Sequence, residues 1–172
     1  MASISMITNA VRVVLRAVTA AAAGVAAVVM ATSQEMSDAF VFGFQMEAKF
    51  QYSPSLVFFV IANAVACAYS LLALIVPLES PAARFVLMAD VIVSMLLSGA
   101  IGAAAAVSDL GKNGNSHAFW QPICGLVETF CQHVGGALIS SLVAVILCFL
   151  ALIYSIYALT KPTSSTESQP QP

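Results

Sequence analysis

Charged residues are scarce in this sequence. Only 8% of its 172 residues are Asp, Glu, Lys or Arg, against roughly 25% in soluble domains. There is no run of basic residues and no acidic tail, and the formal net charge is only −2, so no nucleic acid is expected as a partner. Hydrophobic residues make up 60% of the chain. The composition therefore excludes an ordinary soluble domain and predicts an integral membrane protein whose first partner is the lipid bilayer.

The sequence also lacks the residue sets that common active sites require. It has two His residues, and it contains no Ser-His-Asp set, metal-binding cluster or glycine-rich phosphate loop. No N-x-[ST] sequon is present, and Ala rather than Gly follows Met1, so neither N-glycosylation nor N-myristoylation is expected. We expect a protein that is not an enzyme and that needs no cofactor.

Four long apolar segments predict an all-α membrane protein, a bundle of four transmembrane helices. At about 1.5 Å per residue, each segment is long enough to cross a hydrocarbon core of about 30 Å. The predicted membrane domain covers residues 11–159, with spans at 11–31, 54–77, 84–108 and 134–159 and larger loops at 32–53 and 109–133. Residues 1–10 are predicted to be a free end, residues 78–83 a tight turn, and residues 160–172 a disordered polar tail.

The first span has a second interpretation as a secretory signal. Arg12 and Arg16 would be its basic region, and cleavage would follow Ala31. The spanning interpretation is favoured because cleavage would remove the best counter-ion for an acidic residue in the third span.

Basic residues divide four to two between the two sides of the bundle. On the side of both termini lie Arg12, Arg16, Arg84 and Lys161, and in the two larger loops lie Lys49 and Lys112. Because the side richer in Lys and Arg is normally cytoplasmic, both termini are predicted to be cytoplasmic and both larger loops external.

Asp90 is a carboxylate inside the third span, and it needs a cation at the same depth. Arg16 is the candidate, because both residues lie roughly 7 to 9 Å from the start of their spans at 1.5 Å per residue. The first and third spans run in the same direction, so a salt bridge between Arg16 and Asp90 is possible within the membrane. We interpret the pair as a structural clasp, and a proton relay or ion pathway is the alternative.

Small residues recur at a spacing of four in the second half of the third span. They are Ser94, Ser98, Gly102 and Ala106. Such a pattern allows another helix to approach closely. It predicts either self-association or tight packing within one bundle.

Cys124 and Cys131 share the second large loop. In an external loop an oxidised pair is the default, although a zinc site that adds His117 and His133 is the alternative. The aromatic residues Phe119, Trp120 and Phe130 are expected to cover the resulting ring or to lie at the level of the lipid headgroups. A role in binding a partner is the other possibility.

The motifs together resemble those of the plant Casparian strip membrane domain proteins and their CASP-like relatives. The resemblance is carried by Leu15 and Arg16, by Asp90, and by the loop sequence GKNGNSHAFWQPIC…FC, whose motif residues are Gly111, Asn113, Gly114, Asn115 and Trp120. It extends from about Val11 to Tyr157, and the segment YSPSLVFFVIANAVACAYSLL is also similar to the family. The first large loop, FGFQMEAKFQYSPSL, lacks the short signature of the strip-forming members, so the chain resembles the CASP-like members.

The resemblance implies roles for these residues and for the protein. Arg16 and Asp90 would be the intramembrane pair of the family, and Cys124 and Cys131 its paired loop cysteines. It also implies a plasma-membrane protein, related to the four-helix MARVEL proteins of animal junctions, that forms homo-oligomers and hetero-oligomers with other CASP-like proteins. The founding members build an immobile membrane scaffold that gathers cell-wall enzymes. The sequence therefore predicts a non-enzymatic scaffold, and a small transporter or channel that uses Arg16 and Asp90 is the alternative.

Overall fold

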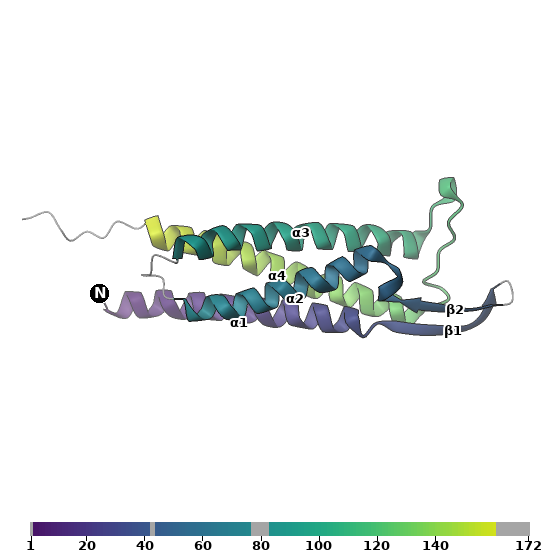
Figure 1. Ribbon diagram of the computed structural model, residues 1–172, viewed down its shortest axis with the longest axis horizontal. Coiled ribbons are helices and arrows are strands. Elements are labelled where there is room, and N and C mark those ends of the chain that lie inside the picture. Colours follow the sequence, from purple (N-terminus) through teal and green to yellow (C-terminus); the bar gives the residue numbers. More distant parts are fainter. Residues whose placement is uncertain (1, 42–43, 77–82, 161–172) are drawn as a thin grey trace, which may run out of the picture.

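Four long helices run side by side and account for most of the chain (Figure 1). The structure, a computed structural model, describes residues 2–41, 44–76 and 83–160. The long helices are α1 (Ala2–Ala31), α2 (Pro54–Ile75), α3 (Ala83–Asn113) and α4 (Glu128–Thr160). Each contains a stretch that is long and apolar enough to cross a membrane. The predicted four-helix membrane bundle is thus confirmed.

The helices are arranged in a ring in chain order. The extensive contacts join α1 to α2, α2 to α3, α3 to α4 and α4 to α1. Therefore α1 and α3 lie on one diagonal of the bundle, and α2 and α4 on the other. The start of α1 and the end of α4 lie at the same end of the bundle (Figure 1).

The helices extend beyond the spans predicted from hydropathy. Helix α1 begins at Ala2, within the segment expected to be a free end, and α4 begins at Glu128, within the expected second loop. A helix satisfies its own backbone hydrogen bonds, so it need not end where the apolar sequence ends. The expected tight turn and the expected tail lie outside the described residues, except for their ends at Ala83 and Thr160.

Small side chains line the inner face of α1 and let its neighbours approach closely. Ala20, Ala23, Ala26 and Ala27 are buried at helical spacing. Lipid is as apolar as the core of the bundle, so van der Waals contact at short range, rather than exclusion from water, favours such packing.

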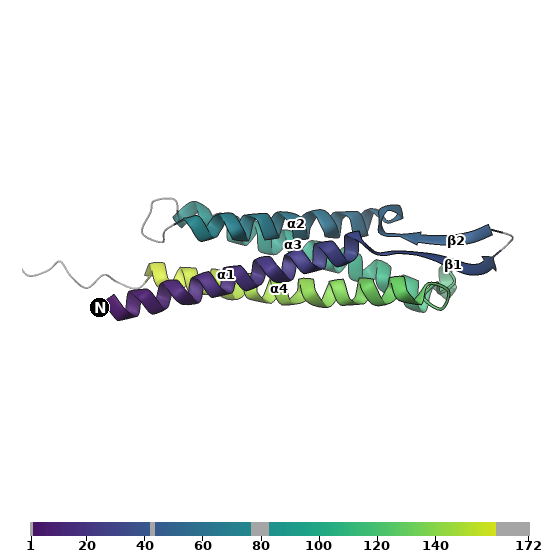
Figure 2. The same ribbon diagram turned by 90° about the horizontal axis from the view of Figure 1, so that it is seen from below.

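A β-hairpin that the sequence interpretation did not include follows α1. Strands β1 (Gln34–Val41) and β2 (Phe44–Lys49) pair in antiparallel fashion, starting with Gln34 opposite Lys49. The hairpin continues past the end of the bundle (Figure 2). A short 3-10 helix, η1 (Phe50–Tyr52), then leads into α2, which opens with Pro54 in its first turn, where a missing N–H does no harm.

Candidate functional site

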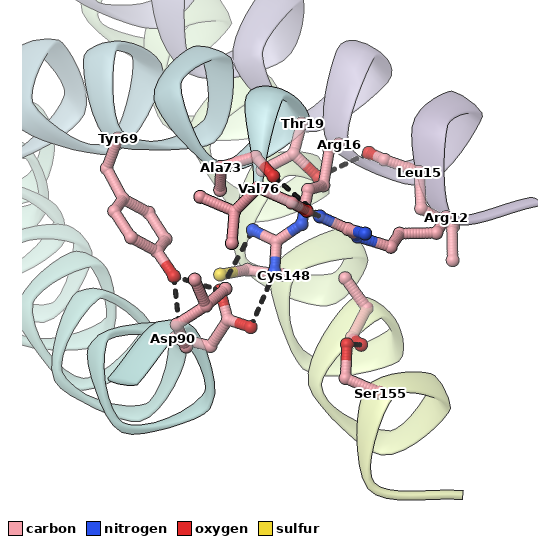
Figure 3. A network of polar contacts seen from close by, with 12 residues as sticks. Arg12, Leu15, Arg16, Thr19, Tyr69, Ala73, Val76, Asp90, Cys148 and Ser155 are labelled. Carbon is pink, nitrogen blue, oxygen red and sulfur yellow. Dashed lines mark hydrogen bonds and ion pairs between the residues drawn. The ribbon is translucent and has the colours of Figure 1, made fainter. Parts of the chain in front are cut away.

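Arg16 and Asp90 form an ion pair in the interior of the bundle, toward the end that carries the start of α3. Arg16 Nη1 donates to Asp90 Oδ1 at 3.0 Å, and Nη2 donates to Oδ2 at 2.7 Å (Figure 3). The contact is bidentate, the geometry that suits a planar guanidinium. Both residues are buried, at 3% and 1% exposure. Because α1 and α3 are not neighbours, the long arginine side chain joins the two helices across the diagonal of the bundle.

Tyr69 brings a second helix to the same carboxylate. Its hydroxyl lies 2.6 Å from Asp90 Oδ1 and 2.8 Å from the Val86 carbonyl, and it can donate its proton to either oxygen. The guanidinium carbon of Arg16 lies 5.8 Å from the centre of the Tyr69 ring, within the range of a cation–π contact. Tyr69 therefore ties α2 to the ion pair of α1 and α3 (Figure 3).

Ser94 links the same group of polar side chains to α4. Its hydroxyl lies 2.7 Å from the Asp90 carbonyl oxygen and 3.2 Å from Cys148 Sγ. Both Ser94 and Cys148 are buried. All four helices thus contribute a side chain to one buried polar layer.

Arg12 lies one turn before Arg16 and binds the end of α2. Its Nη2 donates to the carbonyl of Ala73 at 2.7 Å and to the carbonyl of Val76. Ala73 lies in the last turn of α2 and Val76 directly follows the helix. Carbonyls at this end lack an intrahelical N–H, and a cation there also meets the negative end of the helix dipole. Arg12 is therefore a helix cap supplied by a neighbouring helix.

The other diagonal is joined by a neutral pair. Ser141 of α4 donates to Asn63 Oδ1 of α2 at 2.8 Å, and Asn63 Nδ2 donates to the Phe59 carbonyl at 2.9 Å. Asn63 and Ser141 have no exposed surface. Among the described residues, each diagonal is therefore spanned by a buried contact between polar side chains.

Apart from the Asn63–Ser141 pair, large apolar side chains lie in the core between the ion pair and the hairpin end. Met30, Phe59 and Leu97 have no exposed surface. Among buried side-chain nitrogen and oxygen atoms of the described residues, only Arg16 Nε lacks a hydrogen-bond partner. Each oxygen of the Asp90 carboxylate thus has a hydrogen-bond partner within the protein.

The small residues of α3 do not share one environment. Ser94 is buried and points to α4, whereas Ser98, Gly102 and Ala106 are exposed on the outside of the bundle. The helix has 3.6 residues per turn, so each step of four residues rotates the stripe by about 40°. The first step, from Ser94 to Ser98, already takes the stripe out of the core, and Gly102 and Ala106 remain on the outer surface. A Cβ added at Gly102 would meet no atom within 4 Å.

Cys124 and Cys131 are joined by a disulfide, which confirms that expectation, and their Cα atoms lie 5.7 Å apart. The two sulfurs that the zinc alternative requires are therefore bonded to each other, and His117 and His133 are exposed. The bond attaches the loop to the first turns of α4. Of the aromatic residues expected near the ring, Phe130 is buried and both Phe119 and Trp120 are exposed.

The motif residues before the disulfide shape the loop backbone. The carbonyl of Gly111 accepts from the backbone N–H groups of Ile123 and Cys124. Asn113 donates to Asp109 at 2.7 Å. Asn115 caps the 3-10 helix η2 (Ser116–Ala118), because its side chain accepts from His117 N and Ala118 N. The loop motif is thus largely a set of backbone supports.

Glu35 links the hairpin to α4. Its Oε2 accepts from the backbone N–H of Phe130 at 2.6 Å, in the first turn of α4. A carboxylate there satisfies an unpaired N–H and meets the positive end of the helix dipole. At the end of the hairpin, hydrogen bonds from Lys49 and Tyr52 lower the pKa of the Glu47 carboxyl.

Sequence reasoning did not assign Tyr69 or Glu35 to any contact. A signal for Tyr69 exists, because it lies slightly under two turns before the end of α2 while Asp90 lies slightly under two turns after the start of α3. The depths therefore match. No local signal identifies Glu35, whose partner is 95 residues away.

Comparisons with known proteins give consistent matches. The family model described as the Casparian strip membrane protein domain matches residues 5–147. CASP-like protein 1C1 of Sorghum bicolor is 53% identical over 124 residues, which are 72% of this chain and 76% of that protein. CASP-like protein 1C1 of Oryza sativa subsp. japonica is 52% identical over 151 residues, 87% of this chain and 92% of that protein. CASP-like protein 1C1 of Arabidopsis thaliana is 43% identical over 149 residues, 87% and 90% of the two chains. No solved structure matches the chain significantly.

Proposed function

Because the chain belongs to the Casparian strip membrane protein domain family, we propose that it is a non-enzymatic scaffold of the plasma membrane. In this proposal it assembles with copies of itself and with other CASP-like proteins into membrane domains. The external loops then present a surface to cell-wall-modifying enzymes. Both termini are cytoplasmic, because Arg12, Arg16 and Arg84 lie at that end of the bundle and favour the inner side.

The observation that carries the proposal is the buried, bidentate ion pair of Arg16 and Asp90. Asp90 is bound by Arg16 and Tyr69 and is 1% exposed. A proton relay or ion pathway needs a carboxylate that exchanges its partner with water or with an ion. A buried carboxylate bound by both Nη atoms of Arg16, with the Tyr69 hydroxyl 2.6 Å away, is suited to fixing the helices instead. This is why the clasp is favoured over the transporter or channel.

The outward face of α3 supports assembly. Ser98, Gly102 and Ala106 are exposed at membrane depth, so another helix can approach the α3 backbone closely. The proposed oligomer contact lies on this face. Ser94 takes no part in it, because its hydroxyl already contacts Cys148.

Photobleaching of a fluorescent fusion in a plant plasma membrane tests the scaffold. The proposal predicts patches that do not recover, and it predicts that Gly102→Leu restores recovery by blocking close helix approach. Gly136→Leu is the matched control, because Gly136 is also exposed and a Cβ there would meet no atom within 4 Å. Free recovery of the unmodified protein, or equal effects of both variants, would contradict the proposal.

A second measurement separates the clasp from the relay. Asp90→Asn should reach the cell surface poorly or assemble poorly, since it leaves Arg16 without its counter-charge. A variant that reaches the surface in normal amounts, forms normal patches and loses only an ion or proton flux would support the transporter alternative instead.

A further inference from the structure

The loop between α3 and α4 carries two large aromatic side chains that are exposed. Phe119 is 91% exposed and Trp120 is 58% exposed. Aromatic side chains stabilise a protein mainly when they are buried. Two neighbouring exposed ones therefore indicate a surface that contacts something outside the bundle.

The backbone of the loop is arranged to hold these two residues outward. Asn115 and Trp120 exchange two backbone hydrogen bonds, of 2.9 and 3.0 Å. Phe119 adopts a φ of 55°, a left-handed conformation that is uncommon for a bulky residue. Gly114 has a φ of 67°, and a Cβ there would lie 2.6 Å from the Trp120 carbonyl oxygen. The exposure of the aromatics is thus a property of a closed turn, which includes a strained residue, and not of a loose segment.

The loop leaves the bundle sideways. In Figure 1 the green segment between the right-hand ends of α3 and α4 rises away from the helix axes, whereas the hairpin continues along them. In Figure 2, turned by 90°, the same segment lies behind the bundle. A segment that projects sideways from a membrane bundle lies over the neighbouring lipid.

The depth of the loop matches the lipid headgroups. The apolar sequence of α3 ends at Val107 and is followed by Ser108 and Asp109. At about 1.5 Å per residue, Asp109 to Asn113 lie roughly 3 to 9 Å outside the hydrocarbon core, so the last turn of α3 crosses the headgroup layer, which is about 5 to 8 Å thick. Trp is enriched at this level, because its ring is apolar and its N–H is polar.

The composition of the loop fits the same layer. Residues 113–127 contain no Asp, Glu, Lys or Arg. We propose that Phe119 and Trp120 insert into the headgroup layer beside α3 and hold the loop flat on the bilayer, as a lipid-facing aromatic anchor. The disulfide-bonded part of the loop is thereby kept at a fixed height above the membrane.

The chain contains its own probe, because Trp120 is its single tryptophan. The full chain is reconstituted in phosphatidylcholine vesicles at a high lipid-to-protein ratio, and tryptophan emission is recorded. Quenching of the Trp120 emission is compared for three quenchers. They are iodide in the water, a spin label on the lipid headgroup, and a spin label at the end of the lipid acyl chain. The anchor predicts about threefold weaker quenching by iodide than for a free tryptophan derivative, and stronger quenching from the headgroup label than from the chain-end label.

Phe119→Ser is the variant that tests the anchor, because this side chain makes little contact with the rest of the protein. It should bring iodide quenching to within roughly twofold of the free derivative. Phe85→Ser is the matched control, since Phe85 is 75% exposed at the other end of α3 and should leave the emission unchanged. An intact disulfide, measured by thiol titration, shows that the loop has formed in each variant.

Three outcomes would overturn the proposal. One is iodide quenching as strong as for the free derivative, with no effect of either labelled lipid. Another is protection that develops only when a soluble cell-wall glucan oligosaccharide is added, which assigns the aromatics to sugar binding. The third is protection from iodide that is lost when the amount of protein per lipid is lowered. That result would assign the two aromatic residues to contact with a second copy of the chain.

Discussion

Arg16 and Asp90 meet through two hydrogen bonds, although their helices lie on opposite corners of the bundle. The pair therefore does not simply bind one helix to its neighbour. It spans the bundle from α1 to α3, and the contacts of Tyr69 and Ser94 extend the same layer to α2 and α4. One buried charge pair thus lies in a polar layer to which all four helices contribute a side chain.

Replacing Tyr69 with Phe should weaken the layer without breaking the ion pair. The hydroxyl hydrogen bond to a charged group would be lost while the ring remains, so we expect destabilisation of about 1 to 2 kcal/mol. The change in the free energy of unfolding is measured by titrating the purified protein, in mixed micelles, with a denaturing detergent. A loss as large as that of Asp90→Asn would show that Tyr69, not Arg16, is the main partner of the carboxylate.

Ser141→Ala tests the neutral contact on the other diagonal. Hydrogen bonds between membrane helices contribute about 0.6 kcal/mol on average, so the effect should be small. Asn63 would then be buried with its Oδ1 unpaired, which adds to the loss of stability. The total loss should still not exceed about 2 kcal/mol. The same detergent titration serves, and a larger loss would mean that the neutral pair dominates the fold.

Breaking the disulfide should loosen the loop and leave the bundle intact. Cys124→Ser is expected to cost about 2 to 3 kcal/mol by the loop-entropy estimate for a short ring. Amide hydrogen exchange should rise in residues 114–127 and remain unchanged in α2. Cys67→Ser is the control, since Cys67 is a free cysteine. Equal exchange in both variants would argue against a role of the disulfide in ordering the loop.

Glu35→Gln should raise exchange at one particular amide. The backbone N–H of Phe130 would lose its charged acceptor and the favourable charge at the start of α4, a loss of about 1 kcal/mol. The test is exchange at Phe130 and in the hairpin, with Glu47→Gln as the control for charge. If the Phe130 amide remains as protected as before, the hairpin is held to α4 by other contacts.

Much of this arrangement could be predicted from the sequence, and the limits have a physical cause. Hydropathy gave the four helices, and rise per residue placed Arg16 and Asp90 at equal depth. The loop cysteines and the family were confirmed. Depth along a span can be computed from residue number, but rotation about the helix axis depends on packing. This is why Ser94 and Gly102 could be read as one face although they lie in different environments.

The β-hairpin and its attachment were not predicted for a related reason. A polar loop of 22 residues between two spans carries no hydropathy signal that separates a hairpin from irregular structure. The contact that fixes it, from Glu35 to Phe130, joins segments 95 residues apart. Such contacts follow from the folded arrangement and not from local pattern.

The central claim is tested most directly by a double-mutant cycle on Arg16 and Asp90. Unfolding free energies are measured for the wild type, Arg16→Gln, Asp90→Asn and the double variant in the same detergent system. A clasp predicts a loss of about 3 to 5 kcal/mol for each single variant, because each leaves one buried charge without its partner. It also predicts that the double variant is more stable than either single one. Losses that simply add would contradict the clasp.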